Sequence, residues 1–184
     1  MTKVYFVRHA QPDHAWKDDR TRPLTVEGRE DSRKVLEFLP DKKIDSFYCS
    51  PYKRSMDTIE EIITDERLRE RESGRNGNHH GMFRRRWEDH GFHKEGGESI
   101  AMVQDRNVTA LKDILQKNDG RNIVIGTHGT ALSSILNHYD SGFNCDCFLR
   151  ILDWMPYIIE LDFENGTCTD KIEHLHIKKE FMGK

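Results

Sequence analysis

The sequence has little cysteine and no long apolar run, and both shortages narrow the class of protein. The chain has 184 residues, and its four cysteines are Cys49, Cys145, Cys147 and Cys168. Residues 1–3 run directly into the first predicted strand without an apolar leader, which argues against a secreted disulfide framework. No stretch approaches the length needed to span a bilayer. We expect a cytoplasmic protein with reduced thiols and no membrane partner.

The chain also lacks a large excess of charge of either sign. Its 29 lysine and arginine residues face 32 aspartate and glutamate residues, which gives a formal net charge of -3. This balance supplies no global field that would attract nucleic acid, so we expect no nucleic-acid partner. Hydrophobic residues make up 35% of the chain and gather in blocks, which supports a folded core. The length predicts a single domain over residues 1–184.

Several of these blocks have the pattern of β-strands. The predicted strand segments are VYFVRHA (4–10), IDSFYCSP (44–51), NIVIGTHGT (122–130), MPYIIELDF (155–163) and KIEHLHIKK (171–179). The last two are joined by Asn165 and Gly166, which is a hairpin signal. Strands that alternate with helices predict an α/β three-layer sandwich. We expect a mostly parallel central sheet with helices on both faces and an antiparallel edge.

Capping residues mark where the predicted helices begin. Thr25 and Ser99 each precede apolar residues at helical spacing, and a further helix is expected after His128. Ser50 and Pro51 are expected to open another helix, because serine caps well and proline fits the first turn. The apolar face of that helix would be formed by Ile59, Ile62 and Ile63.

Residues 66–97 differ in composition from the rest of the chain. They are rich in Arg, Glu, His and Gly and have few apolar residues at periodic positions. We predict a long loop or irregular lid there, since loops of this size in compact domains are usually functional or disordered. The segment contains Arg84, Arg85 and Arg86 beside Trp87. These arginines have two interpretations: a solvated face, or contacts to a bound molecule.

Two predicted strands end at histidine, His9 after Arg8 and His128 before Gly129. Because the carboxyl ends of strands in an open α/β sheet form a ligand-binding edge, these side chains can converge there. Arg54 lies one turn into the helix predicted after Ser50, and a helix N-terminus favours an anion. The planar guanidinium group suits phosphate because it donates two parallel hydrogen bonds. The sequence therefore predicts a phosphate pocket.

Six segments in this order resemble one family: RHA (8–10), PLT (23–25), SPYKRSMDT (50–58), RLRERESG (67–74), GGES (96–99) and THG (127–129). Together they resemble the histidine phosphatase superfamily, which has the phosphoglycerate mutase-like fold. The resemblance implies that His9 takes the phosphoryl group as a phosphohistidine. It also implies that His128 donates to the transferring group and that Glu70 protonates the leaving oxygen.

The resemblance assigns phosphate binding to Arg8 and Arg54, with Gly129 in the same substrate-binding set. It implies no metal and no cofactor, because arginines and histidines can stabilise the transferring charge. Ten histidines raise the alternative of a metal site, but they lack paired cysteines or acidic ligands at metal spacing. Some positions depart from the family pattern. Ala10 stands where glycine is usual, and a family asparagine has no clear equivalent near His14.

The expected function is metal-independent hydrolysis of a small phosphorylated metabolite. A first alternative is phosphoglycerate mutase-type transfer, in which the phosphoryl group returns to an organic acceptor. A second alternative is a non-catalytic module that binds phosphate or a phosphoprotein, against which the complete set of reactive residues argues. If the protein hydrolyses such a metabolite, the arginines of residues 84–86 would suit a carboxylate or second phosphate on the substrate. The natural substrate and the oligomeric state do not follow from the sequence.

Overall fold

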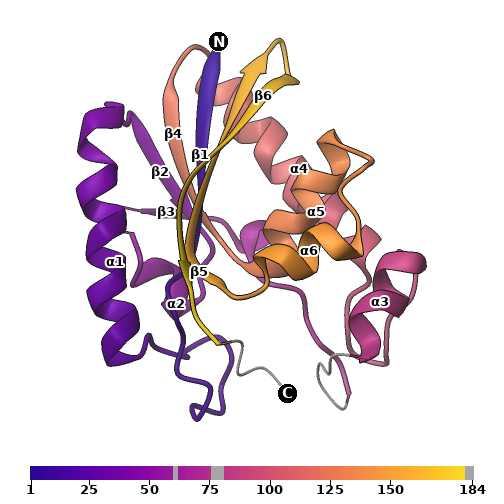
Figure 1. Ribbon diagram of the computed structural model, residues 1–184. Helices are drawn as coiled ribbons and strands as arrows, with labels where there is room; N and C mark the ends of the chain where they lie inside the picture. The colour runs from indigo at the N-terminus through magenta and orange to yellow at the C-terminus, as the bar shows by residue number, and fades with distance from the viewer. Residues whose placement is uncertain (60–61, 76–80, 181–184) are drawn as a thin grey trace.

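A central sheet organises the protein, which the computed structural model describes at residues 1–59, 62–75 and 81–180 (Figure 1). In this part of the chain six strands lie in the order β3-β2-β4-β1-β5-β6. The strands are β1 (Thr2–Arg8), β2 (Ser46–Cys49), β3 (Ile63–Thr64), β4 (Asn122–Thr127), β5 (Trp154–Glu164) and β6 (Thr167–Lys178). Strands β1 to β4 run parallel to one another, β5 runs antiparallel to β1, and β6 runs antiparallel to β5. The predicted mixed sheet is confirmed.

Alternate residues of β1 face opposite layers, because successive strand side chains point to opposite sides of a sheet. Val4 and Phe6 pack in a core with α4 (Ile100–Lys117), α5 (Gly129–Tyr139) and α6 (Cys145–Ile151). Tyr5 and Val7 pack on the other face, where α1 (Val26–Phe38) covers the sheet. Figure 1 shows α1 on one side of the sheet and α4, α5 and α6 on the other. The three-layer prediction is confirmed.

Side-chain caps fix the starts of α1, α4 and α6. Thr25 Oγ1 accepts the Gly28 N–H at 2.9 Å, and Ser99 Oγ accepts the Met102 N–H at 3.2 Å, so both predicted caps are confirmed. Asn144 caps α6 in the same way, but this seven-residue helix was not predicted from the sequence. The predicted hairpin turn is also confirmed, with φ of 50° at Asn165 and 79° at Gly166.

The helix predicted after Ser50 is much shorter than expected. It is α2 (Lys53–Met56), and its N-cap is Tyr52 rather than Ser50. The predicted apolar face was wrong. Ile59 is buried beside the sheet, whereas Ile63 belongs to β3 and is 57% exposed. Residues 60–61 lie outside the described residues. Pairing of β3 with β2 overrode the helical spacing of the three isoleucines.

The segment at residues 66–97 contains two helices that the sequence analysis did not predict. These are η2 (Glu66–Leu68), a short 3-10 helix, and α3 (Gly81–Glu88). Phe83 and Trp87 lie one turn apart in α3, and their rings contact Phe148 of α6 at 5.3 and 5.7 Å between centroids. The segment lacks the apolar periodicity that predicts a helix, and these two aromatic contacts account for the helix instead.

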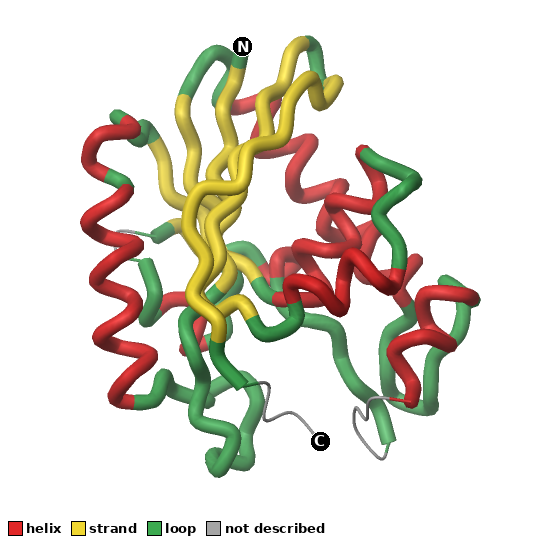
Figure 2. The backbone as a smooth tube through the Cα atoms, viewed as in Figure 1, coloured by secondary structure: helices red, strands yellow, loops and turns green. Residues whose placement is uncertain are grey.

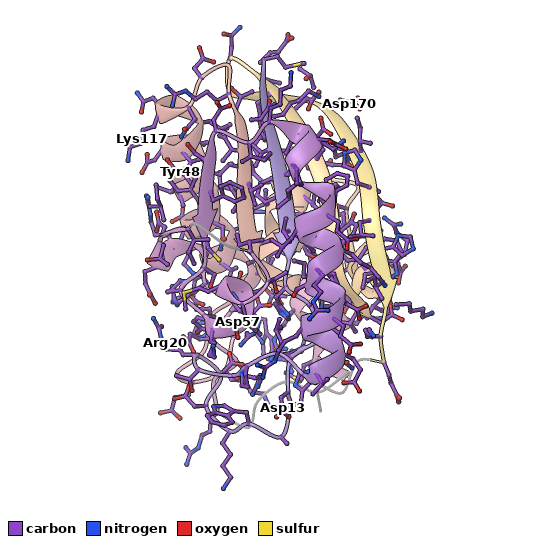
Figure 3. The ribbon with its side chains drawn as sticks, turned by 90° about the vertical axis from the view of Figure 1, so that its left-hand side faces the viewer. Asp13, Arg20, Tyr48, Asp57, Lys117 and Asp170 are labelled. Carbon is purple, nitrogen blue, oxygen red and sulfur yellow. The ribbon has the colours of Figure 1, made fainter. Side chains whose placement is uncertain are left out.

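Loops gather at one end of the sheet, where β1 and β4 end (Figure 2). In Figure 3, Asp13, Arg20 and Asp57 mark this end of the molecule, and Lys117 and Asp170 lie at the opposite end. No helix in the described ranges is long and apolar enough to cross a membrane.

Candidate active site

The ends of β1 and β4 bring the two predicted histidines together. Arg8 is the last residue of β1 and is paired in the sheet with Thr127, the last residue of β4. His9 and His128 therefore follow neighbouring strand ends, and their ring centroids lie 5.1 Å apart. His9 is 5% exposed and His128 is fully buried. The convergence predicted from the strand pattern is present.

Hydrogen bonds define which nitrogen of His9 is available. His9 Nδ1 lies 2.7 Å from the carbonyl oxygen of Ala10, so in the neutral ring Nδ1 carries the proton. Nε2 keeps its lone pair and accepts a hydrogen bond from Arg54 Nε at 3.3 Å. Burial lowers the pKa of His9 well below its ordinary value, and the charges of Arg54 and Arg8 lower it further. The result is a neutral imidazole that can act as a nucleophile.

Arg8 is anchored by α6, the helix that the sequence analysis missed. Its guanidinium group donates to the carbonyl oxygens of Ile151 and, at 2.8 Å, Leu152. Burial lowers the pKa of Arg8 to about 10, which still leaves it charged at neutral pH. A Cβ atom at Gly129 would lie 3.2 Å from Arg8 Nη2 and 3.3 Å from its Cζ. Glycine at this position therefore lets α5 approach the guanidinium group.

Arg54 on α2 is 4% exposed and has an acidic partner that was not predicted. Its Nη1 donates to both the carbonyl oxygen of Asp19 and, at 3.2 Å, the Asp19 carboxylate. Burial is the first cause of a lowered pKa at Arg54, and the charge of Asp19 opposes that effect. A neighbouring arginine, Arg22, also pairs with Asp19. No sequence motif marks Asp19, because it lies in an irregular loop.

Glu70 reaches the site from the segment after η2. Its carboxylate accepts backbone N–H groups of Thr130 at 3.1 Å and Ala131 at 3.2 Å, both in the first turn of α5. The N–H of Arg71 adds a third bond at 2.7 Å. These donors hold the carboxylate beside Gly129 at the N-terminus of α5, where the helix dipole favours negative charge.

Arg106 of α4 holds the backbone that carries Glu70. Its guanidinium group donates to the carbonyl oxygens of Arg67, Arg69 and Glu70, at 2.7 to 3.1 Å. It also donates twice to the Glu98 carboxylate at 2.8 Å. Arg106 therefore positions the general acid candidate without lining the site. Arg106 was not predicted, and its one sequence signal is its place two helical turns after the GGES segment.

These groups surround a cavity of about 350 Å³. Its cationic lining residues are Arg8, Lys17, Arg22, Arg54 and Arg71, and its acidic ones are Asp19 and Glu70. His9 lies in the cavity wall. His128 is fully buried and does not itself line the space, but its ring lies 5.1 Å from that of His9, and its neighbours Gly129 and Thr130 do line it. The cationic residues of the lining outnumber its acidic ones, and this excess of positive charge favours an anion.

The arginines at 84–86 do not line this cavity, contrary to the substrate-contact interpretation. Arg84 pairs with Asp146 on the exposed surface, and Arg85 stacks over the ring of Phe92 at 3.9 Å. Arg86 is 2% exposed and lines a separate, smaller cavity together with Phe83 and Trp87. The helical turn of α3 directs these three side chains apart, which a loop would not require. Arg71, next to Glu70, supplies the further positive charge in the cavity.

The departures from the family pattern fit the local structure. Ala10 is fully buried, its carbonyl oxygen binds His9, and its N–H donates to Thr58 Oγ1 at 3.0 Å. The backbone therefore makes its contacts with a methyl group present. The loop without the family asparagine contributes His14 and Lys17 to the cavity. Within the described residues no cluster of three or more His, Cys, Asp or Glu side chains could hold a metal ion.

Comparison with known proteins agrees with this geometry, since residues 4–151 match the family described as the histidine phosphatase superfamily (branch 1). The chain belongs to the histidine phosphatase superfamily. It is 30% identical over 163 residues to phosphoglycerate mutase-like protein 4 of Arabidopsis thaliana, covering 72% of this chain and 69% of the relative. The family resemblance stated from the sequence is thereby confirmed.

Two solved structures illustrate the shared fold. Phosphoserine phosphatase from Entamoeba histolytica, in complex with 3-phosphoglyceric acid, superposes with a TM-score of 0.76, 19% identity and 98% coverage of both chains. Mycobacterial glucosyl-3-phosphoglycerate phosphatase, complexed with VO3, has a TM-score of 0.74 and 17% identity over 94% of this chain and 97% of the other. These relatives are named for phosphatase or mutase activity, and phosphoryl transfer is common to both.

Proposed function

We propose that this protein is a phosphomonoesterase that works through a phosphohistidine at His9. The observation that carries the proposal is the environment of His9 Nε2. The opposite nitrogen is bound to the Ala10 carbonyl, and Arg54 donates to Nε2 itself. A neutral ring with a directed lone pair beside two arginines can attack phosphorus without losing a proton first.

The proposed reaction has two steps that use the same groups. His9 Nε2 forms a bond to phosphorus while the bond to the ester oxygen breaks, and Glu70 gives that oxygen a proton. Arg8 and Arg54 balance the charge on the transferring phosphoryl group. In the second step the Glu70 carboxylate takes a proton from water, whose oxygen attacks phosphorus. The bond to His9 breaks, and inorganic phosphate leaves.

A mutase is the second candidate, because the mutase-like plant relative is 30% identical. In a mutase an organic hydroxyl group replaces water in the second step, and His9 serves both reactions in the same way. The two candidates differ in their product. Hydrolysis releases inorganic phosphate, whereas a mutase transfers the phosphoryl group from His9 to an organic hydroxyl group and releases an isomer of the substrate.

A substrate with a second negative group suits the cavity. Phosphate binding uses Arg8 and Arg54, and Arg71 remains as a buried cationic wall beside Glu70, with 5% exposure. Its Nη1 is oriented by the carbonyl oxygens of Glu72 and Glu98. Small phosphate esters that also carry a carboxylate therefore fit better than neutral ones. The phosphoserine phosphatase structure with the same fold contains bound 3-phosphoglyceric acid, which is a phosphate ester of this kind.

The proposal is tested by phosphate release from a panel of phosphorylated metabolites. Wild-type protein and His9→Ala are compared, with His138→Ala as a control because His138 lies at the far end of α5. We expect hydrolysis by the wild type and the control, none by His9→Ala, and an acid-labile, base-stable radiolabel on wild-type protein. Activity retained by His9→Ala would remove His9 from the mechanism. Isomerised product without phosphate release would establish the mutase instead.

A further inference from the structure

His128 makes a side-chain hydrogen bond that neither the motif nor the predicted helix accounts for. Its Nε2 lies 2.7 Å from Ser50 Oγ, and both residues are fully buried. Ser50 was expected to cap a helix, yet α2 begins three residues later and has no side-chain cap. The hydroxyl group of Ser50 is directed to His128 instead.

The other contact of Ser50 fixes the direction of this bond. Ser50 Oγ already accepts the N–H of Tyr52 at 3.2 Å. Among the described residues, His128 Nε2 is the acceptor found for the Ser50 hydroxyl proton. If Nε2 carried the proton, the hydroxyl proton and the Nδ1 lone pair would both be buried without partners among the described residues, whereas a proton on Nδ1 leaves only that one N–H without a partner. Each such group costs about 1 to 3 kcal/mol. Ser50 therefore donates to Nε2, and the neutral His128 ring carries its proton on Nδ1.

The remaining nitrogen of His128 is available for a ligand. Nδ1 is buried and has no hydrogen-bond partner among the described residues, and the same is true of Arg8 Nε. The two rings at the site lie 5.1 Å apart, and Arg8 directly precedes His9. A phosphoryl group on the His9 ring would lie beside the His128 ring, and Gly129, which follows His128, lies against the Arg8 guanidinium group. Buried donors normally have a hydrogen-bond partner, and a group bound at this position would be the partner of both nitrogens.

We propose that Ser50 is a positioning residue, which holds His128 in the Nδ1–H tautomer so that this N–H donates to the phosphoryl group carried by His9. The phosphoryl group in this statement rests on the proposed function, whereas the tautomer does not. Both histidines then carry the proton on Nδ1 but use opposite nitrogens. His9 presents a lone pair, and His128 presents a donor.

Burial supports a neutral His128, because it lowers the pKa of His128 well below its ordinary value, with the charge of Arg54 as the next cause. A neutral ring has one proton, so its position decides whether Nδ1 attracts or repels a phosphate oxygen. A preorganised donor at the transferring group acts on the rate more than on binding. Loss of Ser50 should therefore lower kcat and change KM little.

The direct test is a long-range proton–nitrogen NMR spectrum of the ¹⁵N-labelled protein without substrate, with the His128 signals assigned from a His128→Gln sample. We expect a protonated Nδ1 and an unprotonated Nε2 in wild type and in Ser50→Thr, which keeps the hydroxyl group. In Ser50→Ala the proton should move to Nε2 in part or completely. A wild-type spectrum with the proton on Nε2 would overturn the proposal without any variant having to fold.

Kinetics supply the second readout. Ser50→Ala should lose about 10- to 100-fold in kcat with KM changed less than about threefold, since one oriented donor is worth about that much or more. Ser50→Thr should recover most of kcat. Ser133→Ala is the matched control, because Ser133 is also fully buried but bonds neither histidine. An unchanged tautomer and kcat in Ser50→Ala would refute the role of Ser50. The expected tautomer in a protein that hydrolyses no phosphate ester would instead refute only the proposed function.

Discussion

Arg54 and Asp19 form an ion pair at the cavity wall, in which Arg54 Nη1 donates to the carboxylate and to the carbonyl oxygen of the same aspartate. The Arg54 side chain is 5% exposed, whereas that of Asp19 is 48% exposed. The same guanidinium group also donates to Nε2 of His9, the proposed nucleophile. In the proposed function, a substrate phosphate would therefore compete with the Asp19 carboxylate for the positive charge of Arg54.

Asp19→Asn should tighten phosphate binding. Removal of the competing charge is expected to lower KM, and the inhibition constant of inorganic phosphate, by about threefold to fivefold, since a half-exposed ion pair is worth about 1 kcal/mol or less. Glu66→Gln is the control, because Glu66 pairs with Arg20 of the same loop but does not line the cavity. Equal effects of both variants would show that loop anchoring, and not competition, is measured. The assay is phosphate release with phosphate as inhibitor.

Glu70→Gln should separate substrates by their leaving group. The amide cannot protonate an alkoxide, so hydrolysis of an alkyl phosphate should fall by about 10²- to 10⁴-fold. Nitrophenyl phosphate needs little protonation of its leaving group and should lose much less. Glu72→Gln is a nearby control, since its carboxylate accepts from Tyr52 Oη and does not line the cavity. An equal loss on both substrates would give Glu70 a binding role instead.

The sequence predicted the parts of the site that follow from buried strands. Apolar runs ending at His9 and at His128 define β1 and β4, and parallel neighbours must place those ends together. Helix starts at Thr25 and Ser99 were equally readable, because a capping side chain acts within three residues. Local chemistry was sufficient in each of these cases.

Contacts between segments that are distant in the chain could not be predicted from the sequence. Ser50 has the sequence signature of a cap, but its partner His128 lies 78 positions away. The carbonyl oxygens of α6 that bind Arg8 carry no side-chain signal at all. The substrate-contact interpretation of Arg84 and Arg85 failed for the same reason, because contacts with a distant segment decide their surroundings. The aromatic contacts of α3 with Phe148 make a helix of a segment that was predicted as a loop. Family motifs point to the candidate reactive residues, and tertiary packing decides which neighbours orient them.

Arg106→Met should reduce both stability and turnover. The Arg106 and Glu98 side chains are 13% and 9% exposed, so loss of one partner of this pair is expected to cost about 3 kcal/mol. Three carbonyl oxygens before and at Glu70 also lose their donor. Urea unfolding measures the first effect, and kcat at a temperature where the variant is folded measures the second. Normal kcat in the folded variant would show that Glu70 is held by α5 alone.

The stability of the protein should fall as the pH decreases from about 7 toward 5. Burial lowers the pKa of His9 and of His128 well below the ordinary value, with Arg54 as the second cause for each. In the unfolded chain both rings titrate near about 6.5, so below that pH the unfolded chain binds more protons than the folded protein. The free energy of unfolding is then fully retained above about pH 7 and is lost as the pH falls from the unfolded pKa toward the folded pKa.

His9→Gln isolates one of these two contributions. Each buried neutral histidine adds at most about 1.4 kcal/mol per pH unit to the slope of the unfolding free energy, so the variant should have a shallower slope by up to that amount. The measurement is urea unfolding of both proteins at several pH values between 5 and 8, and the comparison uses the slope rather than the absolute stability. His9→Gln changes the absolute value through lost contacts, whereas the slope counts protons. Parallel curves for the two proteins would mean that His9 has the same pKa in the folded protein and in the unfolded chain, so that burial does not keep its ring neutral below about pH 6.5.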